Sequence, residues 1–433
     1  MTGNTLNVYD KNLQALSAQN FQYLNFHLPA DISAGETILT LTGSGLTVPV
    51  IGTTVNTYAS GVTGLRAGDE LTLLSGKIDT SAGELNTVEG TIEIGISKEY
   101  KTVYETQTEN ADSDYVRIKV VDTGRGLKSQ TKSLAETAVF SSALAAGGAD
   151  ALVNSAMDSA EIAARARAKW MPYANMGYSD MRYDSGSHID ANGWNLNLGA
   201  ARRFISTGGE LLVGPFFEYG RSDYDSYSEG IHADGDGHFT GGGIFVRQKN
   251  NNGFYYEGSV RGGRVKADYK TDGMNGGTVH EEFEYDTNYW AFHVGVGKEF
   301  ELKNRSRLNA YLRYFYTHQN DFSAPLSSGE TYDFDDVTSS VIRAGARWSR
   351  EVNDYSTLYA GLAYQYEFDS EAAAHFDGDS TLSPSLEGSS GMLELGWQVR
   401  PKKDGNMAVD VGVAGWAGKK RGVNFHAGVK WDL

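Results

Sequence analysis

The chain has 433 residues, 52 glycines, 7 prolines, no cysteine and a formal net charge of −17, from 38 Lys and Arg against 55 Asp and Glu. This charge argues against a nucleic-acid partner, and the lack of cysteine excludes a disulfide scaffold, a thiolate metal site and a cysteine nucleophile. A mean hydropathy of −0.41, without an apolar run of about 18 residues, excludes a membrane helix, but transmembrane β-strands alternate and average out as polar.

The aromatic residues are unevenly distributed. Residues 1–168 hold 6 Tyr, 3 Phe and no Trp, whereas the rest of the chain holds 19 Tyr, 15 Phe and 7 Trp. The change coincides with the end of an alanine-rich stretch and indicates a domain boundary. We therefore expect three units, at residues 1–126, 127–169 and 170–433.

The first unit consists of short runs of β-forming residues separated by Gly, Asn, Asp and Ser. The runs are Thr37–Thr42, Leu46–Ile51, Glu70–Leu74, Gly90–Ile96 and Tyr115–Val121. They predict an all-β unit, either a sandwich or stacked coils of a solenoid. The start, Met1-Thr-Gly-Asn4, lacks the basic and apolar parts of a signal peptide, so an exported protein would be represented here by a fragment or a mature form.

The second unit changes to helical composition, with 13 alanines between residues 133 and 168. The pair Gly147-Gly148 predicts a division into two helices, and Ser133 with Glu136 fits a capping box. A helix from Ala149 to Lys169 would be about 30 Å long, which is the thickness of the hydrocarbon core of a bilayer. Its charged residues suit a water-filled lumen rather than lipid: Asp150, Asp158, Glu161, Arg165 and Arg167.

The third unit repeats some 10–15 residues of alternating apolar and polar character, followed by a loop rich in Gly, Asp, Asn and Ser. Val423, Phe425 and Ala427 share one face of the last segment, opposite Asn424 and His426. This period of two predicts strands with two unlike faces. Twelve strands are expected, centred near Asn175, Leu196, Pro215, Phe245, Val260, Val294, Leu312, Ala344, Leu362, Leu395, Val411 and Ala427.

These strands predict a membrane barrel. Trp and Tyr near the strand ends match the interfacial girdle of an outer-membrane barrel, and an even strand number is typical of bacterial barrels. A soluble repeat fold is the alternative. The polar face either lines a pore and holds the helix by charge pairing or is an ordinary solvated interior. The residues in question are Arg313, Arg343, Arg347, Glu394, Arg400, Asp410 and Lys430.

The arrangement of a helix that fits a lumen and twelve amphipathic strands resembles the C-terminal translocator domain of monomeric autotransporters, the type V secretion proteins of Gram-negative bacteria. Ser133-Leu-Ala-Glu136, the following alanines and Gly148-Ala-Asp150 are similar to the family's linker, and Trp170–Ser179 is similar to its first strand. The resemblance covers Leu127 to Leu433. Tyr23–Thr42 is similar to the β-rich end of a passenger. One departure is Leu433, since many such barrels end in Phe or Trp.

The resemblance implies a translocator without conventional catalysis, in the bacterial outer membrane, with residues 1–126 as a passenger remnant at the cell surface. The implied partners are outer-membrane lipid and lipopolysaccharide, the barrel-assembly machinery, periplasmic chaperones and the chain's own passenger. It implies a monomer that needs no cofactor and no metal. Asn154, in the helix, is a candidate for self-cleavage by asparagine cyclisation, although an isolated helical asparagine usually has no such role.

Other chemistry has little support in the sequence. Ala233–His238 and Asp377-Gly-Asp379 mimic the start of a calcium loop but lack the remaining ligands, so we expect acidic surface loops. Gly241-Gly-Gly243 and Gly262-Gly263 fall in predicted strands, which disfavours phosphate binding. No Gly-x-Ser-x-Gly elbow precedes a helix.

Two alternatives stay open. One is an outer-membrane barrel hydrolase, a phospholipase or protease, using a histidine among His188, His238, His280, His293 and His318. Such an enzyme does not need an alanine-rich plug ahead of its first strand. The other is a porin or an adhesin barrel with an attached β-domain.

Overall fold

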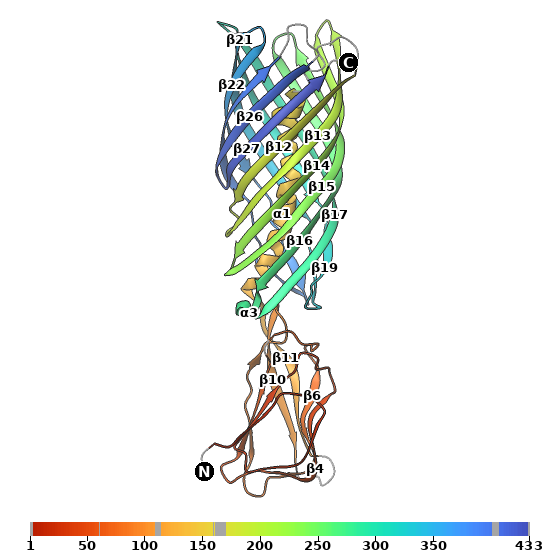
Figure 1. Cartoon of the computed structure of the whole chain (residues 1–433), viewed down its shortest axis with the longest axis vertical. Coiled ribbons are helices and arrows are strands. Elements are labelled where there is room, and N and C mark those ends of the chain that lie inside the picture. The colour runs from red at the N-terminus through yellow and green to blue at the C-terminus, as the bar shows by residue number, and fades with distance from the viewer. Residues whose placement is uncertain are drawn as a thin grey trace.

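The computed structural model describes residues 3–59, 61–108, 114–158, 160, 170–400 and 407–431. Glu161, Arg165, Arg167 and Leu433 lie outside these residues. A long barrel surrounds a helix, and a separate β-rich domain stands at one mouth of the barrel (Figure 1). Among the described residues, no helix is long and apolar enough to cross a membrane.

The β-rich domain contains eleven short strands within the described residues. They are β1 Thr5–Val8, β2 Leu13–Gln19, β3 Tyr23–His27, β4 Thr37–Thr47, β5 Thr53–Tyr58, β6 Glu70–Ser75, β7 Ile78–Asp79, β8 Leu85–Thr87, β9 Thr91–Ile92, β10 Lys98–Gln107 and β11 Tyr115–Leu127.

The pairing of these strands decides between a sandwich and a solenoid. One sheet has the parallel order β1-β3-β5-β8, and the other begins with the parallel strands β2, β4 and β6. Successive strands thus alternate between two parallel sheets, which is the path of a solenoid coil and not of an antiparallel sandwich. The antiparallel strands β11, β10 and β9, and the short strand β7, which pairs with β4, complete the second sheet.

The prediction of a separate strand at Leu46–Ile51 is wrong. Leu46 and Thr47 end β4, and the chain then turns, leaving Val50 85% exposed and Ile51 71% exposed. Gly90–Ile96 is also shorter than expected, because only Thr91 and Ile92 form a strand before the backbone bends.

The helical unit begins with a 3-10 turn at Ser129–Thr131, followed by α1 at Lys132–Ala151 and a π-helical segment at Leu152–Ala156. The predicted division at Gly147-Gly148 is wrong, since α1 runs through both glycines. A capping box at Ser133 is wrong as well, because the helix starts at Lys132. The Ser133 hydroxyl lies 2.8 Å from the Tyr269 hydroxyl, and Glu136 accepts from Ser185 and Ser187.

Within the described residues, twelve antiparallel strands form the closed barrel, and β27 pairs with β12. Each contains one of the twelve predicted centres. The strands are β12 Met171–Tyr183, β13 His188–Ser206, β14 Gly209–Ser228, β15 Ile231–Asn250, β16 Phe254–Gly273, β17 Val279–Leu302, β18 Ser306–Gln319, β21 Val337–Asn353, β22 Ser356–Glu367, β25 Gly388–Val399, β26 Met407–Gly418 and β27 Lys420–Trp431.

Several strands are longer than predicted, up to the 24 residues of β17. Ala233–His238 is therefore not a loop, as the sequence suggested, but part of β15. A one-turn helix, α3 Met274–Gly277, joins β16 to β17. At the same mouth, hairpins between barrel strands form a four-stranded sheet, here called the surface sheet, from β19 Phe322–Pro325, β20 Thr331–Phe334, β23 Ala374–Phe376 and β24 Asp379–Ser380.

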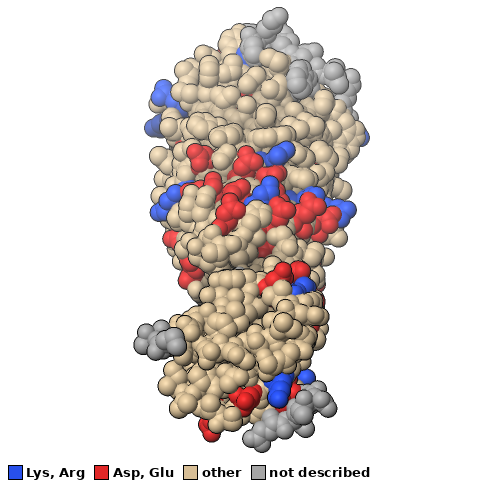
Figure 2. All heavy atoms as spheres, turned by 60° about the horizontal axis from the view of Figure 1, so that its bottom comes forward, with Lys and Arg blue, Asp and Glu red and all other residues tan. Residues whose placement is uncertain are grey.

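The outer wall of the barrel has two zones. Leu362, Val260 and Leu393 are more than 60% exposed on the outside, which is the orientation expected for lipid-facing side chains. Figure 2 shows charged side chains gathered on the part of the wall nearest the β-rich domain and few charges beyond it. On the outer face of β16 and β17, the ion pairs Arg264–Asp286 and Lys266–Glu284 join these two neighbouring strands. The long strands thus continue past the apolar zone.

Candidate functional site

The lumen is filled by α1 and the π segment, whose small residues allow close packing. Ala149, Val153 and Ala156 share a buried cluster with wall residues that include Phe216 and Phe245. A Cβ added at Gly148 would lie only 2.6 Å from Nη1 of Arg261 and 2.8 Å from Oε2 of Glu218. A side chain at position 148 would therefore displace this buried ion pair, which accounts for a glycine inside the helix.

Arg261 on β16 forms the first of three contacts between cations of the wall and the helix. Its guanidinium donates to the backbone carbonyl of Ala145 at 2.7 Å and to Glu218 of β14 at 3.1 Å. The hydroxyl of Tyr289 donates to the same carboxylate at 2.7 Å. Because Arg261 and Glu218 are both buried, each needs the other's charge.

Asp150 of α1 forms the second contact. One of its carboxylate oxygens lies 2.5 Å from Nη2 of Arg343 on β21, and the other lies 2.6 Å from Nζ of Lys420 on β27. Arg343 also donates to Gln365 at 2.8 Å. One helical carboxylate is thus held between two cations from separate strands of the wall.

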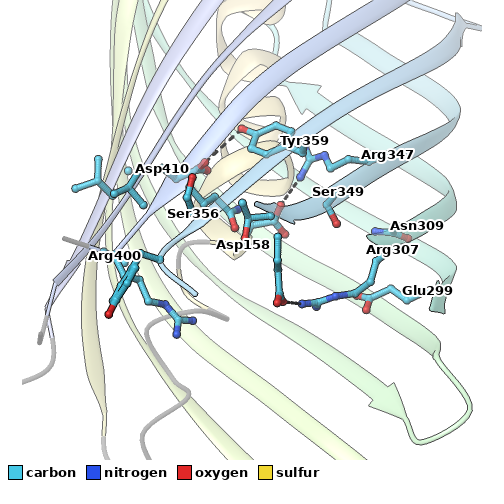
Figure 3. Close-up of a pocket in the computed structure, with 18 of the residues that line it drawn as sticks. Asp158, Glu299, Arg307, Asn309, Arg347, Ser349, Ser356, Tyr359, Arg400 and Asp410 are labelled. Carbon is cyan, nitrogen blue, oxygen red and sulfur yellow. Dashed lines mark hydrogen bonds and ion pairs between the residues drawn. The ribbon is translucent and has the colours of Figure 1, made fainter. Parts of the chain in front are cut away.

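Asp158 forms the third contact. Its two oxygens lie 2.5 Å from Nη1 of Arg347 and 3.2 Å from Nη1 of Arg247. Figure 3 shows Asp158 and Arg347 pointing toward each other inside the barrel. Wall carboxylates support both cations, with Glu394 2.6 Å from Arg347 and Glu257 2.8 Å from Arg247.

The structure brings together only some of the predicted lumen residues. Pairing of Arg343 and Arg347 with the helix is confirmed, and Glu394 supports Arg347. Arg313 instead binds Glu257 at 2.6 Å, and Asp410 lies 3.5 Å from His426. Arg400 points away from Asp158 (Figure 3), and the side chain of Lys430 lies outside the described part.

Sequence reasoning missed five charged wall residues that take part in these contacts: Glu218, Arg247, Glu257, Arg261 and Lys420. A signal for them exists. Each lies at an inward-facing position of a strand that was correctly predicted. Applying the two-residue period to every charged residue of these strands would have found them.

Beyond Asp158 the lumen opens into a polar cavity of about 330 Å³, lined by residues that include Lys249, Glu299 and Arg307. Opposite charges pair across this cavity wall, as in Lys249–Glu299 at 2.5 Å. In the described ranges, no group of three or more His, Cys, Asp or Glu side chains is placed to hold a metal ion. The arrangement is suited to retaining a polypeptide segment.

A comparison with family models matches residues 170–412 to the autotransporter β-domain. This match covers more than half of the chain. The chain belongs to the autotransporter β-domain family. Its barrel is accordingly the translocator of an autotransporter, an outer-membrane β-barrel that works as a monomer on its own N-terminal passenger. The family assignment decides for the translocator over a porin or an adhesin barrel.

One solved structure supports the same fold, and two others are similar to a lesser degree. The translocator domain of the autotransporter NalP from Neisseria meningitidis aligns with a TM-score of 0.52 and 15% identity, covering 68% of this chain and 99% of that one. The β-domain of the Bordetella autotransporter BrkA aligns with a TM-score of 0.49 and 19% identity, covering 61% of this chain and 99% of that one. The transport unit of the autotransporter AIDA-I from Escherichia coli aligns with a TM-score of 0.45 and 16% identity, covering 68% of this chain and 99% of that one. A sequence search of curated proteins finds no match.

The five histidines considered for a hydrolase are not brought together in the translocator. His188 and His238 stack on Tyr227 and Tyr219 of the outer wall. His318 lies tilted against Trp290, and His280 is exposed. His293 alone faces inward, with Nδ1 2.5 Å from the Ser259 hydroxyl. Its Nε2 has no hydrogen-bond partner among the described residues, so no carboxylate completes a triad there.

Asn154 lies in the π-helical segment of the translocator. Its backbone carbonyl accepts from Arg347 at 3.3 Å, and its side-chain oxygen is buried without a hydrogen-bond partner in the described part of the chain. Self-cleavage at Asn154 stays a prediction. Unchanged release of the passenger from an Asn154→Asp variant would eliminate it.

Proposed function

We propose that the translocator displays residues 1–126 at the cell surface and keeps its helix in the lumen as a plug after export. The observation that carries this proposal is the pairing of Asp150 and Asp158 with four wall cations inside the closed barrel. The β-rich domain stands directly outside one mouth (Figure 1), as expected for a passenger that has left the lumen. We divide the chain into residues 1–126 as passenger end, 127–169 as linker and plug, and 170–433 as barrel.

The outer wall supports the proposed membrane partners. Its exposed apolar zone fits lipid, and the charged band on the side of the β-rich domain (Figure 2) fits the headgroup level of the outer leaflet, where lipopolysaccharide lies. The barrel-assembly machinery and periplasmic chaperones are the partners expected for inserting such a barrel. The translocator acts by conformation and charge pairing, without catalysis and without a cofactor.

Surface labelling tests the proposal. The chain is produced in a Gram-negative host behind a signal peptide, with an epitope tag fused ahead of Met1. The expected result is that intact cells bind the antibody and that external protease removes the tag while the barrel persists. A tag that is detected only after the outer membrane is permeabilised overturns the proposed orientation. A tag placed after Leu433 is the matched control and is expected to require permeabilisation.

A further inference from the structure

Residues Gly95–Lys98, here called the docking segment, belong to the β-rich domain by sequence but contact the barrel. Ile94 is buried in the aliphatic core of the β-rich domain. Ile96, two residues later, is fully buried in a different cluster, together with Tyr332 and Phe334 of the surface sheet. The side chain of Ile96 is therefore not part of the domain core, and it needs the barrel in order to leave water.

The two residues flanking Ile96 lie against Glu330 in the same part of the barrel. The hydroxyl of Ser97 donates to Glu330 at 2.5 Å and pairs with the hydroxyl of Tyr332. At Gly95 an added Cβ would lie 2.3 Å from Oε1 of Glu330, so a larger residue would push this carboxylate away. Gly95, Ile96 and Ser97 thus fit one continuous surface, which is formed by Glu330, Tyr332 and Phe334.

Lys98 completes the segment with three ion pairs. Its Nζ lies 2.7 Å from Asp379, 3.1 Å from Asp377 and 3.0 Å from Asp122, and the side chain is 2% exposed. Asp377 and Gly378, with φ of 52° and 82°, form the two-residue turn between β23 and β24, as in type I′ hairpins. The motif that mimics a calcium loop therefore holds a lysine ammonium.

The charge of the Lys98 ammonium is stabilised by carboxylates from both the β-rich domain and the surface sheet. Burial alone would lower the pKa of Lys98, but Asp379, Asp122 and Asp377 raise it above its ordinary value. Asp122 belongs to β11 of the β-rich domain, whereas the other two belong to the surface sheet. Burying this cation with only one of the two bodies in place would leave its desolvation poorly compensated.

The position of Lys98 in the chain makes the contact conditional on folding. Leu127 ends β11 just before the helix enters the barrel, and it pairs with Lys98 in the β10–β11 register. In an extended chain Lys98 would lie roughly 100 Å from Leu127. Lys98 therefore returns to the mouth only after β10 has paired with β11.

We propose that the docking segment is a latch that binds the surface sheet only when the β10–β11 hairpin has folded, so that the domain locks onto the mouth once the end of the passenger next to the barrel has folded outside. The proposal rests on the proposed function, which places this mouth outside the cell. The occupant of the surface sheet is thus the chain's own segment Gly95–Lys98, held by one cation, one hydroxyl and one apolar side chain.

Cross-linking tests the latch. Because the chain has no cysteine, Glu99→Cys with Ser380→Cys gives a background-free pair for a bis-maleimide on intact cells, next to Lys98 and Asp379 but with the three ion pairs of Lys98 left in place. The expected result is efficient cross-linking, which is lost when Val103→Pro prevents β10 from pairing with β11. Val103→Ala is the matched control and keeps the cross-link. Equal cross-linking in the Val103→Pro chain overturns the conditional latch, and no cross-link in any chain overturns the docking.

Limited proteolysis tests the contribution of the ion pairs without new cysteines. With Asp377→Asn and Asp379→Asn combined, cleavage by trypsin at the joint around Arg125 and Lys128 is expected to accelerate about tenfold. The matched control, Asp335→Asn, removes a carboxylate that pairs with His375 and is expected to leave the rate unchanged. Equal rates in the double variant and the unaltered chain contradict the latch.

The surface tag separates the two proposals. If the tag ahead of Met1 is hidden in intact cells, the proposed orientation fails. If the tag is exposed but the cross-link and the protease rates do not respond, only the latch fails. Should the double variant not reach the surface, the same proteolysis is carried out on the full chain refolded in detergent.

Discussion

The barrel holds the rest of the chain at two places with opposite charge. In the lumen the helix supplies carboxylates and the wall supplies cations, whereas at the mouth the β-rich domain supplies the cation and the barrel supplies two of its three carboxylates. The groups are Asp150 and Asp158 against Arg247, Arg343, Arg347 and Lys420 in the lumen, and Lys98 against Asp377 and Asp379 at the mouth.

This reversal gives each contact its own partner. The cations of the lumen wall repel Lys98 of the docking segment. The carboxylates of the surface sheet repel Asp150 and Asp158 of the helix. Attraction between the correct partners and repulsion between the wrong ones together determine where the chain stops in the barrel. The net charge of −17 gives no hint of this arrangement.

The largest expected effect is on the lumen contact. Asp150→Asn leaves Arg343 and Lys420 facing each other without a full counter-charge, which is expected to cost about 3 kcal/mol of unfolding free energy. Thermal unfolding in detergent measures this. Arg182→Gln, which breaks an exposed pair with Asp190 on the outer wall, is the matched control at less than about 1 kcal/mol. Equal effects of the two substitutions would refute the structural role of the lumen pair.

A second prediction uses two adjacent glycines of α1. Gly148→Ala forces Arg261 and Glu218 to move and is expected to destabilise the folded barrel by about 2 kcal/mol. Gly147→Ala meets no atom within 4 Å and is expected to stabilise the helix by up to about 1 kcal/mol. Unfolding curves in detergent for the two variants should shift in opposite directions. Shifts of the same sign would contradict the packing described for Gly148.

Salt sharpens the comparison of the two places. Asp377 and Asp379 are 62% and 41% exposed, whereas Asp150 is 12% exposed. At 1 M salt the screening length falls to about 3 Å, so the mouth contact is expected to weaken while the lumen contact persists. Trypsin cleavage at the joint should accelerate, and the temperature of barrel unfolding should stay constant. Parallel loss of both contacts would show that they are not independent.

The smallest expected effect concerns pH at the mouth. Burial, with a contribution from Glu281, raises the pKa of Glu330 above its ordinary value, although Ser97 and Lys128 act in the other direction. A carboxyl whose folded pKa is raised contributes stability below its unfolded pKa and loses it as pH rises through the folded pKa. Glu330→Gln is therefore expected to remove a mild strengthening of docking on acidification, measured as the trypsin rate from neutral to mildly acidic pH. An unchanged pH profile in this variant would contradict the assignment.

The barrel could be predicted because its information is local. A period of two with unlike faces placed all twelve strand centres, since each strand must present apolar residues to lipid and polar residues to the lumen. Strand lengths were underestimated because outward charges such as Asp234 and Asp236 look like a loop, although they continue β15 beyond the apolar zone.

The remaining features depend on contacts between distant parts of the chain. Parallel pairing of β2, β4 and β6 decides for a solenoid, and no short-range pattern specifies it. The sequence alone predicts that Gly148 interrupts the helix, and only the structure shows Arg261 beside it. The latch on Lys98 needs the turn at Asp377 and Gly378, some 280 residues later in the chain, so the motif was read as an acidic loop.

Single-channel conductance tests the central claim, that the lumen is closed by a helix held through charge pairs. The full chain in a planar bilayer is expected to give small, intermittent conductance. Combining Asp150→Asn with Asp158→Asn is expected to lengthen the open intervals, and deletion of residues 133–168 is expected to give large, steady conductance. Large, steady conductance in the unaltered chain would contradict the account.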